Sequence, residues 1–160
     1  MKKFQIIFVS MMLFHCFSMS IIAVTTLSSD GANNTIIDKN SSLFGYSVSY
    51  LGKINASLGN FYAISAPFDG SSGQFDSGKL YLFEESIISK NSITTSNATV
   101  TIQGTEKDAE TGLFIAAGGD LDKDGLKDFV LINPNLSSNQ ISIYLGKYYN
   151  NWTTTTIVRI

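Results

Sequence analysis

The sequence has 160 residues but only one histidine and one cysteine, His15 and Cys16. Beyond these two residues no side chain can form a disulfide, act as a thiol nucleophile, complete a Ser-His-Asp triad or bind zinc through an imidazole. Arginine is scarce as well, since Arg159 is the only one. Of 11 basic side chains, nine remain without Lys2 and Lys3, against 13 acidic ones, for a net charge of −4. We therefore expect neither an enzyme nor a nucleic-acid-binding protein.

The N-terminal segment has the pattern of a secretory signal peptide. Two lysines precede an apolar run over residues 4–24, and small residues occupy the −3 and −1 positions of a cleavage site after Ser20. We expect residues 1–20 to form a helical signal peptide that is removed. An uncleaved signal anchor, reaching to about residue 24, is the alternative. Either one places the following chain outside the cell, secreted or on the extracellular face. Residues 21–34 are expected to be a flexible linker.

Asn-x-Ser/Thr sequons are frequent in the chain. In a eukaryotic host they predict a glycosylated surface, although a sequence this rich in Asn, Ser and Thr also produces sequons by chance. The six candidate asparagines are Asn33, Asn40, Asn55, Asn97, Asn135 and Asn151.

An internal repeat organises the rest of the chain. A shift of 67 positions aligns residues 43–67 with residues 110–134 without a gap. After a length difference of six, residues 79–83 align with residues 140–144. The identical pairs in the long alignment are two glycine pairs and one proline pair: Gly45 with Gly112, Gly52 with Gly119, and Pro67 with Pro134.

Each repeat unit is expected to contain short β-strands. The apolar runs are brief and bounded by Gly, Ser and Asn, and no helical period follows residue 30. Four antiparallel strands in about 60 residues are typical of a β-propeller blade. A β-sandwich is the rival, but it does not require two halves with the same internal order. The predicted strands are 46–51, 61–66, 80–83 and 99–103, then 113–117, 129–132, 141–145 and 153–158.

The units themselves are assigned to residues 35–96 and 97–150. Residues 151–160 are a candidate first strand of a third unit.

A cluster of aspartates in the second unit predicts a calcium site at residues 120–128. Alternate aspartates let a tight loop direct three carboxylates inward, and Gly125 permits the sharp turn. Oxygen ligands alone suit Ca²⁺, whereas Mg²⁺ needs stricter octahedral geometry. The predicted ligands are the side chains of Asp120, Asp122, Asp124 and Asp128 and the backbone carbonyl of Leu126.

The loop has two other interpretations. An EF-hand requires a bidentate Glu at the twelfth position between helices, but that position is Leu131, inside a strand-like run. A plain Asp-Gly turn with Lys123 and Lys127 as counterions is the remaining alternative. In the first unit Lys53 replaces the first aspartate, so no metal is expected there.

Together these features resemble FG-GAP repeats, the blades of the integrin α-subunit propeller. Phe44-Gly45 matches the Phe-Gly of that family, and Ser65-Ala66-Pro67 nearly matches its Gly-Ala-Pro. The aspartates of residues 120–128 fit its calcium loop, and residues 78–83 resemble its closing strand. The resemblance extends from about residue 35 to the C-terminus. It implies an all-β fold with two four-stranded antiparallel propeller blades.

The resemblance also implies a function. It suggests an extracellular calcium-binding module for cell adhesion or ligand binding, in which the calcium is structural. The partner would be a protein or another extracellular ligand, together with further propeller blades that this chain lacks. No membrane contact is expected beyond the N-terminal anchor. The alternatives are a non-catalytic scaffold of a secreted, phospholipase-like hydrolase, or a truncated propeller fragment without independent function.

Overall fold

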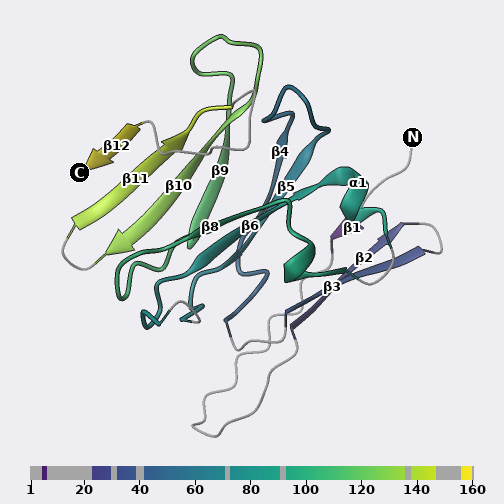
Figure 1. The fold of residues 1–160 in the computed structure, drawn as a ribbon, viewed down its shortest axis with the longest axis horizontal. Coiled ribbons are helices and arrows are strands. Elements are labelled where there is room, and N and C mark those ends of the chain that lie inside the picture. Colours follow the sequence, from purple (N-terminus) through teal and green to yellow (C-terminus); the bar gives the residue numbers. More distant parts are fainter. Residues whose placement is uncertain are drawn as a thin grey trace, which may run out of the picture.

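The protein is all-β. The computed structural model describes residues 5–6, 23–29, 32–38, 42–70, 73–90, 93–135, 138–146 and 156–159. The strands form three four-stranded sheets, shown in Figure 1. Among the described residues, the helical turns are the short helix α1 (Glu85–Ile88) and a 3-10 turn at Thr95–Asn97.

Two of the sheets are antiparallel and follow the chain from strand to strand. The first contains β4 (Val48–Gly52), β5 (Phe61–Ala66), β6 (Lys79–Glu84) and β8 (Val100–Gln103). The second contains β9 (Phe114–Gly119), β10 (Asp128–Asn135), β11 (Ser138–Tyr144) and β12 (Thr156–Arg159). Each of the eight predicted strands overlaps one of these, so the strand predictions are confirmed.

The two sheets also share their pairing registers. In the first hairpin of each sheet, equivalent pairs lie 67 positions apart and a bulge interrupts the ladder before the loop. The second hairpins also correspond, because the residue after the bulge pairs with an aromatic residue of the third strand in both sheets. The equivalent pairs are Val48↔Ile64 with Ile115↔Leu131, Tyr50↔Tyr62 with Ala117↔Phe129, and Tyr62↔Phe83 with Phe129↔Tyr144.

Glycine explains why the bulge recurs. Gly52 and Gly119 end the first strand of their sheets with φ values of 74° and 79°. Most L-residues avoid this region, whereas glycine adopts it freely, and a glycine of this kind is typical of a bulge. The aligned glycines therefore form the same β-bulge in both units.

The sheet boundaries differ from the predicted unit boundaries. Strand β8 pairs with β6, so residues 100–103 complete the first sheet rather than open the second unit at residue 97. Likewise β12 pairs with β11 and completes the second sheet, where residues 151–160 were a candidate start of a third unit. The division between the sheets lies between β8 and β9.

The third sheet contains β1 (Gln5–Ile6), β2 (Ala23–Ser29), β3 (Ala32–Asp38) and β7 (Ile93–Thr94), with β3 and β7 parallel. Strands β2 and β3 occupy much of the segment 21–34 that was expected to be a linker. Apart from β1, the signal peptide expected at residues 1–20 lies outside the described residues. Within the part of the chain that the structure describes, no helix is long and apolar enough to cross a membrane.

Apolar side chains cover both faces of the first sheet. One cluster joins it to the second sheet and includes Leu80, Leu82, Phe129, Leu131 and Tyr144. A second cluster covers its other face. It contains Ile36 of β3, Phe44 of the segment before β4, Ile88 of α1 and Ile93 of β7. The first sheet is therefore the central layer.

Truncating a buried side chain of this layer should lower the free energy of unfolding. Leu82 is fully buried between the first and second sheets. We expect Leu82→Ala to lower the free energy of unfolding by about 2–5 kcal/mol, because it removes apolar contacts and leaves a cavity. Urea denaturation followed by circular dichroism measures the loss. Phe75→Ala is the control, since Phe75 is 67% exposed and its truncation should change stability by about 0.5 kcal/mol or less. Equal losses in the two variants would contradict the packing described.

Candidate metal centre

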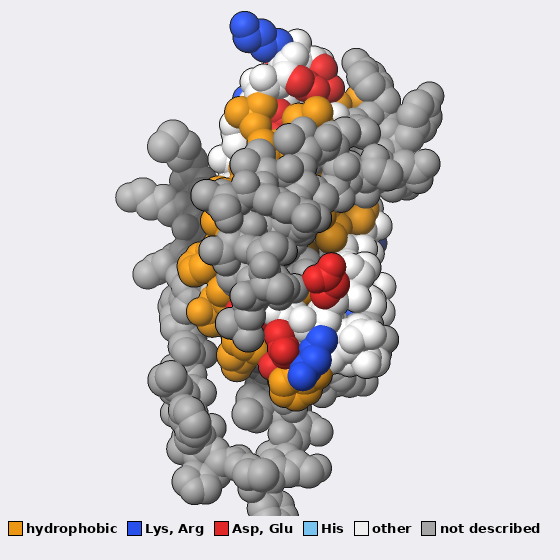
Figure 2. Space-filling view, turned by 90° about the vertical axis from the view of Figure 1, so that its left-hand side faces the viewer, with side chains coloured by type: hydrophobic (Ala, Val, Ile, Leu, Met, Phe, Trp, Pro, Cys, Tyr) orange, Lys and Arg blue, Asp and Glu red, His pale blue; other side chains and the backbone are white. Residues whose placement is uncertain are grey.

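The acidic loop connects β9 to β10 and projects beyond the second sheet. It corresponds in register to the loop between β4 and β5, since both follow the bulge glycine. At the top of Figure 2, acidic and lysine side chains gather at this tip of the molecule. The loop is therefore accessible to an ion from solvent.

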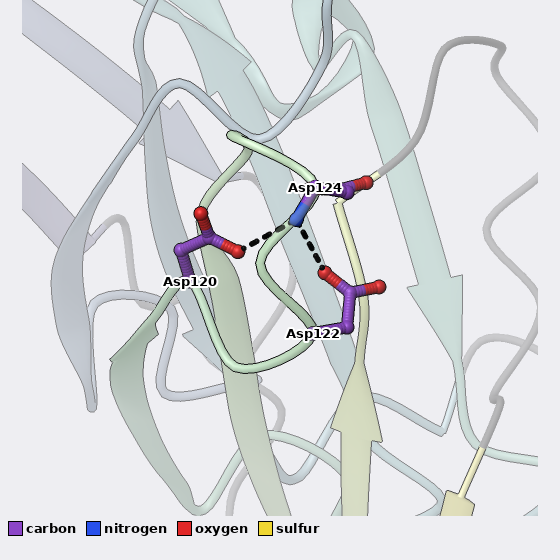
Figure 3. Close-up of side chains that lie close together, drawn as sticks. All are labelled: Asp120, Asp122 and Asp124. Atoms are coloured by element: carbon purple, nitrogen blue, oxygen red, sulfur yellow. Dashed lines mark hydrogen bonds between the residues drawn. The ribbon is translucent and has the colours of Figure 1, made fainter.

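Backbone N–H groups fold the loop around its own carboxylates. The N–H of Asp124 donates to Asp120 Oδ1 at 3.1 Å and to Asp122 Oδ1 at 3.2 Å, as Figure 3 shows. The N–H of Gly125 donates to Asp120 Oδ2 at 3.0 Å. These hydrogen bonds curl the chain and bring the three aspartates close together.

The three carboxylates lie close enough to share one cation. One oxygen from each of Asp120, Asp122 and Asp124 can be chosen so that all three lie within 4.8 Å of one another. Asp120 is half-buried and the other two are exposed. Like charges at this separation repel, and a cation between them removes that cost. Among the described side chains neither Lys123 nor Lys127 forms an ion pair with them.

Asp128 has a different environment from the three loop aspartates. Its side chain is fully buried, and Oδ1 accepts the N–H of Gly146 at 2.8 Å while Oδ2 accepts the N–H of Leu121. The structure does not group Asp128 with the other three. Through these two hydrogen bonds, Asp128 connects the start of the loop to the residues that follow β11. Gly146 was not foreseen from the sequence, because nothing local connects it to residues 18 positions earlier.

Leu126, predicted to offer its backbone carbonyl, anchors the other end of the loop. Its side chain is 5% exposed, and its N–H donates to Asp124 Oδ1 at 2.8 Å. A side chain at Gly146 would meet the Cβ of Leu126 at 2.5 Å, so only glycine fits against it. The next residue reaches the first sheet, because the N–H of Lys127 donates to the carbonyl of Lys53 at 2.9 Å. The acidic loop is thus tied to both sheets.

The equivalent loop of the first sheet is stabilised without carboxylates of its own. Asn55 is 1% exposed, and its Oδ1 accepts the N–H of Ser57 at 2.8 Å. Asn55 is one of the predicted glycosylation candidates, and its side chain is thus held inside the structure. Asn97 is exposed. The side chains of Asn33, Asn40, Asn135 and Asn151 lie outside the described residues.

A second acidic contact joins the loop after β5 to the loop before β9. The N–H of Asp108 donates to the carbonyl of Phe75 at 2.9 Å, and that of Glu110 donates to the carbonyl of Asp76 at 2.9 Å. Partial burial, and then the negative charge of Asp108, raise the pKa of Asp76. The sequence did not suggest this contact, because the two loops are distant along the chain.

No family model and no curated protein matches the sequence. The site is therefore interpreted from its geometry and from the repeat.

The anchoring role of Asp128 can be separated from metal binding by working in a chelator. Asp128→Asn places an NH₂ group where a buried carboxylate oxygen accepts a backbone N–H, so we expect a loss of about 1–3 kcal/mol in the free energy of unfolding. Asp122→Asn is the control, because this exposed residue keeps the oxygen that accepts an N–H and should change stability by about 0.5 kcal/mol or less. Urea denaturation in EDTA compares them. Equal midpoints would show that Asp128 anchors nothing.

The contact between Asp76 and Asp108 predicts a pH effect. Because the folded state raises the pKa of Asp76, it binds that proton more tightly than the unfolded state does. Protonated Asp76 therefore contributes to the stability of the fold below the unfolded pKa. This contribution is lost as the pH rises through the raised pKa of the folded state. Asp108→Asn removes the repulsion and should stabilise the protein by about 0.2–1 kcal/mol at pH 7. The gain should vanish near pH 3, where a protonated Asp76 carries no charge for Asp108 to repel. Thermal unfolding at both pH values checks this, and the same gain at both would contradict it.

Proposed function

We propose that the protein is an extracellular calcium-binding β-propeller module of the FG-GAP type, acting in cell adhesion or ligand binding. The observation that carries the proposal is the cluster of Asp120, Asp122 and Asp124 at one end of the second of two equivalent sheets. The calcium is structural. The partner is a protein or another extracellular ligand.

The repeated sheets support the propeller assignment. Each is a four-stranded antiparallel meander, and the two have matching registers and matching bulges. They pack face to face, with β4 beside β9, so the first strand of one unit adjoins the first strand of the next. Propeller blades are four-stranded sheets repeated around a central axis, with their faces in contact. A sandwich of two unrelated sheets would not need matching registers.

The donor set supports calcium. The loop offers carboxylate oxygens, and Ca²⁺ binds six to eight oxygen ligands in flexible geometry. Asp120, Asp122 and Asp124 would hold the ion, with the carbonyl of Leu126 and water as further oxygen donors. Each oxygen of Asp128 retains a lone pair beyond the hydrogen bond it accepts, so Asp128 remains compatible with the ligand set.

A structural role for the ion is supported by the connections of the loop. Asp128 at the end of the loop accepts the N–H groups of Leu121 and Gly146. The neighbouring Lys127 donates its N–H to the carbonyl of Lys53, which directly follows β4 of the first sheet. An ion that orders the intervening residues would therefore stabilise the junction of the two sheets. The extracellular assignment is supported by the signal-peptide pattern, and the adhesion role by analogy with the family that the sequence resembles.

Thermal unfolding with and without calcium tests the proposal. An ion that binds only the folded protein stabilises it by about 2.7 kcal/mol at a calcium concentration 100 times the Kd. We expect the midpoint to be higher in calcium than in EDTA, and we expect Asp122→Ala and Asp124→Ala to lose this increment. Asp108→Asn removes one negative charge outside the loop, and this variant should keep the calcium-dependent increase in the midpoint. A wild-type midpoint unchanged by calcium would refute the metal site.

A further inference from the structure

Two tyrosines form an exposed aromatic pair on the first sheet. Tyr50 of β4 pairs directly with Tyr62 of β5, so both side chains lie on the same side of the sheet. Their ring centroids are 5.0 Å apart, and the ring planes are tilted by 55°. Tyr50 is 52% exposed and Tyr62 is half-buried. The pair therefore presents aromatic surface to the solvent.

A carboxylate lies beside this pair. Glu85 begins α1, and this helix covers the same side of the sheet, because its Ile88 belongs to the apolar cluster against which Tyr62 packs. Asn60, which directly precedes β5, donates its side-chain N–H to Glu85 Oε2 at 2.9 Å. Partial burial, and then the negative charge of Glu85, raise the pKa of Tyr62. The carboxylate is thus held close to the aromatic pair.

The charge of Glu85 is not neutralised by a neighbour. Among the side chains that the structure describes, no lysine or arginine forms an ion pair with it. Glu85 is half-buried, and a charge that is partly removed from water attracts an opposite charge more strongly than a fully solvated one does. The site therefore favours a cation.

The repeat shows that a unit does not need this group of side chains in order to fold. In the matched registers of the second sheet, Ala117 and Phe129 occupy the positions of the two tyrosines. Phe129 is fully buried. Two positions beyond the aligned third strands, Gly146 stands in the place of Glu85. The second unit thus forms the same hairpins without either phenol or the carboxylate.

We propose that Tyr50, Tyr62 and Glu85 bind an arginine side chain of a partner protein. A guanidinium group stacks on aromatic faces and is more weakly hydrated than an ammonium group. Its N–H groups also donate to a carboxylate in a planar, two-point contact. A quaternary ammonium ion has no N–H to donate, and the ammonium of lysine has no planar face to stack. The inference rests on the proposed binding function, since it names the chemistry of the partner, but it uses neither calcium nor further propeller blades.

An NMR titration of the isotope-labelled protein in EDTA tests the proposal, with N-acetyl-arginine-N-methylamide as the probe. We expect saturable shifts of the Tyr50 and Tyr62 ring signals. The corresponding citrulline derivative has nearly the same shape but no charge, so its Kd should be at least about threefold higher. The lysine derivative should also bind more weakly than the arginine probe.

Two variants separate the contributions of the rings and the carboxylate. Glu85→Gln keeps an oxygen for the hydrogen bond from Asn60 but removes the charge, and it should raise the Kd of the arginine probe about 3–10-fold. It should leave the Kd of the citrulline derivative nearly unchanged. Tyr50→Leu removes one aromatic face and should raise the Kd of the arginine probe about 2–5-fold. Both variants should keep the wild-type unfolding midpoint within a few degrees, because neither side chain is buried.

Tyr46→Leu is the matched control. Tyr46 is 50% exposed and forms a second aromatic pair with Phe68, with ring centroids 6.3 Å apart, so its loss should leave arginine binding unchanged. Equal binding of the arginine and citrulline probes would overturn the proposal, as would wild-type affinity in Glu85→Gln or equal losses in Tyr46→Leu and Tyr50→Leu. A protein that gains stability from calcium but does not bind the arginine probe would overturn this inference alone.

Discussion

The apolar layer between the two repeated sheets is the contact on which the rest of the structure depends. Leu80 and Leu82 meet Phe129, Leu131 and Tyr144 there, and each is 6% exposed or less. This packing sets the first strands of the sheets side by side and brings the ends of their following loops together. A cluster of carboxylates that repel one another is thereby held at the tip by a closely packed core.

Much of this arrangement was predictable from short-range patterns. The repeat rests on few identities, but its glycines stand where the backbone needs a positive φ, and its apolar runs lie where the strands are buried. The grouping of Asp120, Asp122 and Asp124 was predictable for the same reason. Alternate residues of a tight loop converge whatever the rest of the chain does.

Features that depend on distant partners were not predictable in this way. The segment Val100–Gln103 has the composition of an edge strand, but composition does not say which sheet it joins. Asp128 follows the other aspartates in sequence and was grouped with them. It is buried because the strand begins there, and its partners Leu121 and Gly146 are backbone groups whose position follows from the tertiary structure. Residue type alone carries no information about such contacts.

The cover on the first sheet has a consequence for biosynthesis. It consists of Ile36, Phe44, Ile88 and Ile93, all of which precede β9 in the chain. Because translation proceeds from the N-terminus and domains generally fold as units while the chain emerges, this cluster can close before the second sheet has been made. The growing chain then has one unprotected sheet surface at a time. Vectorial synthesis thereby shortens the period in which the core sheet is open to aggregation.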